Sequence, residues 1–258
     1  MLQLRAYVLI LGICAVHSKP VIAVEEPPIG SVGSTVRTFS VGQPEGGTVT
    51  LPEHFKDAQA IVIVFVSFEC PVSNSYIAPL GELSKRYADK GVVVVGVCPG
   101  EGAAVVKKQL AEFKVTWPVF ADPELKAVRF LGAKRMPEAF VLDAKGVIRY
   151  RGRIDDGWLT PGKPNPRPAT PDLKNAIDGV LAGRAPTPAE TVAVGCPVSR
   201  PAPAKVETPV GMHPTYYKEV LPVLQNRCQD CHRPGEVGPF SLMTFKQATR
   251  WGELIKEY

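Results

Sequence analysis

The sequence predicts an α/β sandwich, in which helices cover both faces of a largely parallel sheet, followed by a linker and a small all-α segment. Two continuous apolar runs, at residues 60–68 and 92–97, are each followed by a helical stretch. Strands that are buried on both faces of a parallel sheet have this composition. The content of 45% hydrophobic and 21% charged residues is that of a globular chain with a real core.

The first strand is expected over Ala60–Phe68, and a helical stretch follows it to about Tyr87. In that stretch Tyr76, Leu80, Leu83 and Tyr87 recur at helical spacing, and we expect this stripe to be core rather than a ligand site. The second strand, over residues 92–97, leads into a helical stretch that ends near residue 114.

Two further strands are expected in "EAFVLDAKGVIRYRGRI", where the turn at residues 143–146 is a hairpin signal. A closing helix is predicted over residues 171–181. The resulting order, βαβαββα, is that of a thioredoxin-like fold, and we assign it to residues 30–184. Proline and alanine dominate residues 185–210, which predicts a linker carrying Cys196, and residues 211–258 form a separate segment.

The N-terminus has Arg5 ahead of an apolar run from Ala6 to Val16, the layout of a secretory signal over residues 1–23. A buried strand or helix is the alternative. The run is too short to span a bilayer, so we expect an exported, periplasmic protein with no membrane span after signal removal, and Cys14 is discarded with the signal. The formal charge of +5 is only mildly basic, and without a Lys/Arg run it indicates no nucleic-acid partner.

A candidate nucleophile follows the first strand in "FECPVSNSY", where Cys70 ends the strand region and Pro71 opens a helix. The helix dipole and free backbone N–H groups stabilise a thiolate at this position. A buried, inert cysteine is the alternative interpretation. In "KRMPEAFVLD", Pro137 immediately precedes a strand, and in this fold we expect it to follow a cis peptide bond and to face the active-site sulfur.

The stretches "VFVSFECPVSNSYIAPLGELSKRYADKGVVVVGV" and "MPEAFVLDAKGVIRYRGRIDDG" resemble the bacterial redoxins, thioredoxin-like proteins of the alkyl hydroperoxide reductase/thiol-specific antioxidant group. Two positions depart from the pattern. Ser73 stands where a C-x-x-C motif would have its second cysteine, and Ile63 stands where a peroxiredoxin would have proline. The resemblance implies that Ser67 supplies a hydroxyl near the thiolate.

Two cysteines are candidates for resolving an oxidised Cys70. Cys98 closes the second apolar strand, and if that strand lies parallel to the first, both cysteines emerge at one sheet edge. The resemblance to redoxins favours Cys196, because such chains often end in "GC" after the last helix, matched here by "VAVGCPVSR". We prefer Cys196 and keep Cys98 as the alternative.

The motif C-x-x-C-H occurs near the C-terminus, as Cys228, Cys231 and His232. It is the attachment sequence for covalent haem c, in which the thiols add to the vinyl groups and the histidine binds the iron. Zinc binding and a structural disulfide are the alternatives. The helix before the motif is expected to present one apolar face, made of Tyr217, Val220, Leu221 and Leu224.

The C-terminal stretch "VLPVLQNRCQDCHRPGEVGPFSLMTFKQATRWGELIKE" also resembles the cytochrome c-like module of bacterial fusion proteins, some of which continue into a copper-dependent monooxygenase domain. The expected module is incomplete, because few residues follow the motif. Met243 is the nearest candidate for the distal haem ligand, ahead of Met212 and His213, although core packing is the role we expect for it.

The sequence therefore predicts an exported thiol–disulfide oxidoreductase with a c-type haem module, which transfers electrons to redox partner proteins or small thiol or peroxide substrates. A thiol peroxidase that receives electrons from the haem is one alternative. A non-catalytic docking domain, with the haem as an electron relay for a monooxygenase, is another. No nucleotide cofactor is expected.

Overall fold

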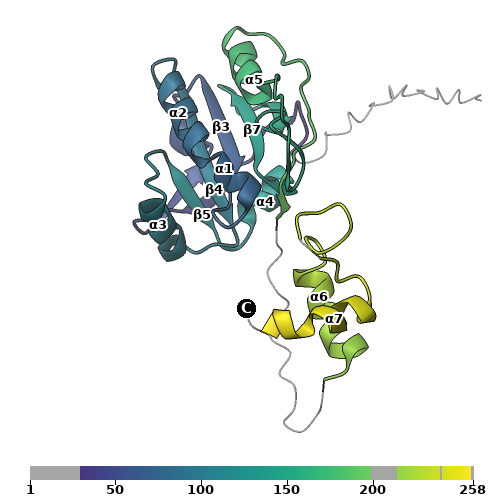
Figure 1. The fold of residues 1–258 in the computed structure, drawn as a ribbon. Coiled ribbons are helices and arrows are strands. Elements are labelled where there is room, and N and C mark those ends of the chain that lie inside the picture. Colours follow the sequence, from purple (N-terminus) through teal and green to yellow (C-terminus); the bar gives the residue numbers. More distant parts are fainter. Residues whose placement is uncertain (1–29, 199–213, 239, 257–258) are drawn as a thin grey trace, which may run out of the picture.

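The computed structural model of the protein describes residues 30–198, 214–238 and 240–256. A seven-stranded sheet has the order β2-β1-β5-β4-β3-β7-β8 (Figure 1). Its strands are β1 (Phe39–Gly42), β2 (Thr48–Leu51), β3 (Ala60–Phe65), β4 (Val92–Pro99), β5 (Val119–Asp122), β7 (Glu138–Asp143) and β8 (Ile148–Gly152). Strands β3, β4 and β5 are parallel, while β7 and β8 are antiparallel to their neighbours. The predicted parallel pair and the β7–β8 hairpin are confirmed, and the fold is thioredoxin-like.

Both faces of the central strands are buried, which explains their continuous apolar runs. Val62 and Val64 belong to one core cluster, whereas Ile61 and Ile63 belong to the cluster on the opposite face. Successive side chains of a strand point to opposite faces, so a strand covered on both sides has no polar position in its middle.

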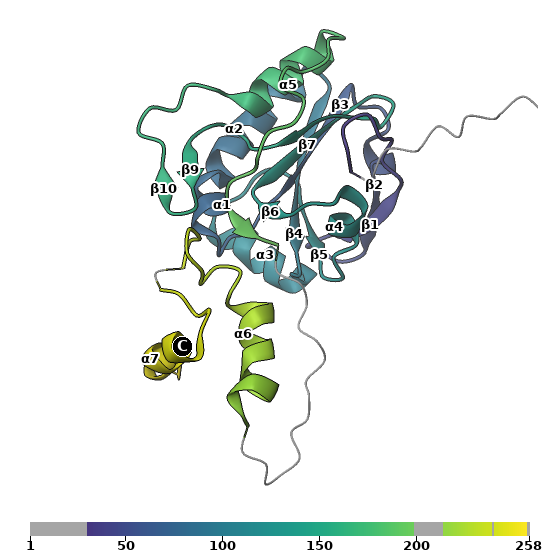
Figure 2. The ribbon, with the colours of Figure 1, turned by 90° about the vertical axis from the view of Figure 1, so that its right-hand side faces the viewer.

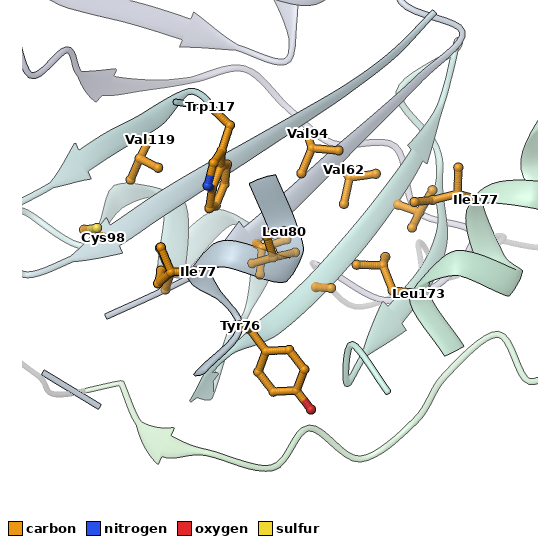
Figure 3. Packing of buried hydrophobic residues seen from close by; sticks show 14 of the residues in the cluster. Val62, Tyr76, Ile77, Leu80, Val94, Cys98, Trp117, Val119, Leu173 and Ile177 are labelled. Atoms are coloured by element: carbon orange, nitrogen blue, oxygen red, sulfur yellow. The ribbon is translucent and has the colours of Figure 1, made fainter. Parts of the chain in front are cut away.

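Helices cover the two faces unequally. Packed on the first face are α1 (Pro71–Ser75), α2 (Ile77–Ala88), α3 (Ala103–Glu112) and α5 (Asp172–Leu181), and Figure 3 shows Leu80 and Ile177 beside Val62 and Val94. The second face carries α4 (Lys126–Leu131) and the short helix η1 (Glu53–Phe55). The predicted closing helix is α5.

The stripe predicted after the first strand is core, as expected, but it spans a break between two helices. Tyr76, Leu80 and Tyr87 are buried in the first cluster, and Leu83 packs against it. Helix α1 ends at Ser75 and α2 begins at Ile77. Pro79 has no N–H to donate to the Ser75 carbonyl, so a continuous helix would lose that hydrogen bond.

Four short strands outside the main sheet were not predicted. Strands β9 (Trp158–Thr160) and β10 (Lys163–Pro164) form a hairpin, and β6 (Arg135–Met136) pairs with β11 (Cys196–Pro197). Strand β11 lies within the expected linker. The first part of that linker, residues 185–198, is therefore folded against the domain, through the β6–β11 pairing and a bridge between Glu190 and Arg151. The expected signal peptide and residues 199–210 of the linker lie outside the described residues.

The C-terminal segment is helical, with a π-helical turn η2 (Tyr216–Val220), α6 (Leu221–Arg227) and α7 (Phe245–Lys256). Its predicted apolar face is partly wrong, because Tyr217 is 74% exposed, whereas Tyr216 packs on the cluster that contains Leu224. The N–H of Val220 donates to the carbonyl of Thr215, five residues earlier. This wider turn changes the helical phase that a 3.6-residue period assumes.

Of the helices in the described ranges, none has the length and apolarity needed to cross a membrane.

Candidate active site

Cys70 lies at the edge of the sheet, directly before α1. It is the residue that precedes the first helical position, Pro71, and its backbone is extended. The side chain is only 4% exposed. The sequence thus places this thiol at the predicted junction between a buried strand and a helix.

A disulfide joins Cys70 to Cys196, with their Cα atoms 6.0 Å apart. The N–H of Cys196 lies 3.3 Å from the Cys70 sulfur, and the carbonyl oxygen of Met136 lies 3.3 Å from the same sulfur. Cys196 reaches this position because β11 pairs with β6, with Cys196 opposite Met136. Of the two candidate resolving cysteines, Cys196 is the one bridged to Cys70.

Pro137 follows Met136 through a cis peptide bond, as predicted. Its ring also lies against β11, because a Cβ atom at Gly195 would come within 3.0 Å of the Pro137 Cδ atom. The same Cβ would collide with the carbonyl oxygen of Met136. Glycine is therefore required at residue 195 for β11 to approach Met136 and Pro137 this closely.

Cys98 has no disulfide partner among the described residues and is fully buried. Burial raises the pKa of its thiol far above the ordinary value, with a smaller contribution from Glu101. Strands β3 and β4 are parallel neighbours, as expected, but Val97 is the partner of Phe65, so Cys98 is still inside its strand. Cys70 lies five residues beyond Phe65. Cys98 is therefore not the disulfide partner of Cys70, which is bonded to Cys196.

Two serines organise the loop before Cys70. The N–H of Ser67 donates to the hydroxyl of buried Ser73 over 2.8 Å. The Ser67 hydroxyl accepts a bond from the N–H of Glu69 at 3.3 Å. Ser73, at the position of a second C-x-x-C cysteine, thus has a structural contact, and Ser67 bonds its own loop.

A buried ion pair that was not predicted from the sequence lies next to the cis-proline. Glu138 is 4% exposed, and its carboxylate accepts hydrogen bonds from the N–H groups of Lys134 (2.7 Å) and Arg135 (3.3 Å). Its other oxygen accepts a 2.6 Å bond from Arg151. The pair fixes the backbone of β6, on which β11 docks. In the sequence, the charged residue directly after Pro137 is the feature that could have indicated this ion pair.

Cys228, Cys231 and His232 lie between α6 and α7 at the second predicted site. Neither cysteine has a disulfide partner among the described residues, and burial raises the pKa of both thiols. The Nδ1 atom of His232 lies 2.9 Å from the carbonyl oxygen of Phe240. Gly238 packs so closely that a Cβ atom there would lie 2.9 Å from the imidazole Cγ. The loop therefore fixes the orientation of the ring.

Met243 is 46% exposed, so the core-packing role expected for it is wrong. The neighbouring Leu242 takes the core position instead, at 2% exposed, and its N–H donates to the His232 carbonyl. Met212 and His213 lie outside the described residues.

Comparison with known proteins identifies related curated chains. The chain is 29% identical over 136 residues to the thiol:disulfide interchange protein DsbE of Pseudomonas fluorescens biotype C, covering 51% of this chain and 72% of that protein. It is 23% identical over 117 residues to the thiol-disulfide oxidoreductase ResA of Bacillus thuringiensis subsp. konkukian, covering 45% of this chain and 66% of that protein.

Solved structures share the fold. A hypothetical protein from Sinorhizobium meliloti 1021 aligns with a TM-score of 0.60 at 25% identity, covering 67% of this chain and 96% of that one. An uncharacterized conserved protein from Geobacillus kaustophilus aligns with a TM-score of 0.61 at 24% identity, covering 69% of this chain and 96% of that one. The family model described as Redoxin matches residues 31–160, half of the chain. The predicted resemblance is therefore confirmed at the level of the family, and the chain belongs to the Redoxin family.

Proposed function

We propose that the protein is a thiol–disulfide oxidoreductase that exchanges electron pairs with a partner disulfide through Cys70 and Cys196. The observation that carries this proposal is the Cys70–Cys196 disulfide at the sheet edge, beside Pro137. The names of the two curated relatives support the same activity.

The exchange proceeds in two thiolate attacks. In the reduced protein the Cys70 thiolate attacks a partner disulfide, one partner sulfur leaves as a thiolate, and a mixed disulfide forms. Cys196 then attacks the Cys70 sulfur, which restores the internal disulfide and releases the partner as a dithiol. In this half-reaction two electrons and two protons pass from Cys70 and Cys196 to the partner. Cys70 directly precedes helix α1, and a position at a helix N-terminus favours the thiolate form.

The redox role is tested with Cys70→Ser and Cys196→Ser. We expect Cys70→Ser to abolish disulfide reductase activity while the fold is kept, because serine is nearly isosteric with cysteine. Cys196→Ser should accumulate a mixed disulfide with the substrate, because the resolving thiol is missing. Cys98→Ser is the matched control and should keep wild-type turnover. Full activity of Cys70→Ser would rule out the proposed nucleophile, and peroxide consumption by the wild type at a comparable rate would favour a peroxidase.

We further propose that Cys228, Cys231 and His232 hold a c-type haem, which supplies single-electron transfer when it is bound. Two features support the fit. The two thiols are unpaired in the described part of the chain, so they are available for thioether bonds. With Nδ1 of His232 donating to the Phe240 carbonyl, Nε2 is the nitrogen left to bind iron.

Haem attachment is tested by expressing the chain with an export signal and a cytochrome maturation system. Thioether bonds survive denaturation, so we expect a haem-stained band on a denaturing gel and a tryptic peptide carrying Cys228 and Cys231 with the added mass of haem. A peptide with two free thiols or bound zinc would contradict the proposal. An exported location is also proposed, because the Cys70–Cys196 disulfide would persist in an oxidising compartment.

A further inference from the structure

One arginine connects the C-terminal segment to the redoxin domain. Arg135 of β6 forms two parallel bonds with Glu236, Nη1 to Oε2 at 3.1 Å and Nη2 to Oε1 at 3.1 Å. The side chains are 28% and 12% exposed, respectively. Bidentate arginine–carboxylate pairs of this kind fix the relative orientation of the two side chains in addition to pairing their charges. In Figure 2 the loop between α6 and α7 reaches the edge of the domain. We call this contact the Arg135–Glu236 joint.

The same guanidinium also holds the strand that carries the resolving cysteine. Nη1 of Arg135 donates to the carbonyl of Gly195, the residue before Cys196, over 2.9 Å. The backbone of Arg135 is paired with Pro197 in the β6–β11 ladder. Arg135 therefore contacts β11 on both sides of Cys196, and Glu236 holds its guanidinium in the required orientation.

Strand β11 covers the nucleophile. Cys70 is only 4% exposed while its disulfide with Cys196 is closed. A reduced Cys70 must reach a partner disulfide, so β11 has to move away once the bond opens. The two-residue pairing, the hydrogen bond from the Val198 N–H to the Lys134 carbonyl and the Arg135–Gly195 bond would then oppose this movement.

We infer that the C-terminal segment docks on the redoxin domain through the Arg135–Glu236 joint, and that docking and the Cys70–Cys196 disulfide stabilise each other. The inference rests on the proposed thiol–disulfide exchange. Coupling between two equilibria is reciprocal, so a joint that favours the closed disulfide is itself weakened when the disulfide opens. The segment with the C-x-x-C-H motif thus senses the redox state of the domain.

The coupling is tested by equilibrating the full chain with mixtures of reduced and oxidised dithiothreitol. Two electrons and two protons pass from dithiothreitol, which cyclises to its disulfide, to Cys70 and Cys196, which become thiols. Alkylation and mass analysis of the two peptides measure this disulfide separately from Cys228 and Cys231. We expect Glu236→Gln to shift the equilibrium about fivefold to tenfold towards the thiols, since allosteric couplings have this size; tenfold corresponds to about 30 mV.

Glu219→Gln is the matched control, because the hydrogen-bond and ion-pair partners of Glu219 lie within the C-terminal segment. It should leave the equilibrium at the wild-type value. The hydrodynamic radius of the wild type gives a second measurement without any substitution, and it should increase when dithiothreitol opens the disulfide. An equilibrium in Glu236→Gln equal to that of the wild type, or a radius independent of redox state, would overturn the inference. A wild-type chain with no exchangeable Cys70–Cys196 disulfide would instead refute the proposed function.

Discussion

At the scale of single residues, the Cys70–Cys196 disulfide depends on close backbone packing as much as on sulfur chemistry. Cys196 reaches Cys70 only because Gly195 has no side chain to collide with the Met136 carbonyl. Glycine here allows a close approach between two backbones, which any larger residue would prevent. A substitution at Gly195 therefore tests the geometry of the site without touching a thiol.

We predict that Gly195→Ala lowers the free energy of unfolding of the oxidised protein by about 1–3 kcal/mol, the usual cost of overpacking a tight contact. The added methyl group must push β11 away from Met136, so the fraction of Cys70–Cys196 disulfide at a fixed redox potential should also fall. Urea denaturation and alkylation measure the two effects. Gly102→Ala is the control, because nothing lies within 4 Å of a Cβ atom there. Equal stability of Gly195→Ala and the wild type would contradict the close contact.

The sequence predicted the two disulfide-bonded cysteines better than the residues that position them. Cys70 and Pro137 could be recognised because a strand end, a helix-opening proline and a proline before a strand are local patterns. Cys196 was predicted only through the resemblance, because it meets Cys70 across 126 residues. Among the supporting residues, Glu138 had one local signal, its charge directly after Pro137, whereas the roles of Arg135 and Gly195 exist only after β6 and β11 have paired.

At the scale of elements, the strands after the cis-proline form the rigid support of the site. Arg151 of β8 pairs with Glu138 of β7, and its second and third hydrogen bonds go to the carbonyls of Gly30 and Gly132. The guanidinium also lies over the Phe140 ring, 5.0 Å from its centroid. One buried ion pair therefore ties two strands of the main sheet to the loop that precedes β6.

We expect Glu138→Gln to lower the free energy of unfolding by about 3 kcal/mol, because removal of one partner leaves the charge of Arg151 buried without its carboxylate. Thermal and urea denaturation measure this loss. The control is Glu82→Gln, whose exposed pair with Lys85 should contribute less than about 1 kcal/mol. A loss at Glu138 no greater than at Glu82 would show that the buried pair does not support the sheet.

The main elements followed from the sequence because their apolar patterns are strong. Strands β3 and β4 and helix α5 lie where the patterns placed them, whereas β5 and the β1–β2 hairpin were missed. Strand β5 has only four residues, and it is buried by its neighbours rather than identified by its own period. The π-helical turn before α6 was also unpredictable, since no 3.6-residue template includes the extra residue.

At the scale of the whole molecule, the ionisation of one carboxylate sets whether the C-terminal segment docks. The hydrogen bond from Arg135 holds the pKa of Glu236 below its ordinary value, and the nearby charges of Arg135 and Arg233 act in the same direction. A carboxylate with a depressed pKa stabilises the docked form above its ordinary pKa, and this contribution is lost as the pH falls through the depressed value.

We predict that the oxidised wild type expands when the pH is lowered from about 7 to about 3, where glutamates become protonated. Small-angle scattering measures this change in dimensions. Glu236→Gln should have the larger dimensions throughout, and should show less change over the same range. A joint independent of this carboxylate would give the two proteins identical pH profiles.

The position of the disulfide along the chain also determines what holds the molecule together after its backbone is cut. Cys70 and Cys196 are separated by 126 residues, so the loop that they close contains every element from α1 to α5. Leu159 in β9 is 51% exposed inside this loop, so a protease cut made after it would leave two pieces that the disulfide still joins. The oxidised chain would then run as one covalent piece on a denaturing gel, and the reduced chain as two fragments. A single proteolytic cut thereby turns the redox state of a buried pair of sulfur atoms into a difference in molecular mass.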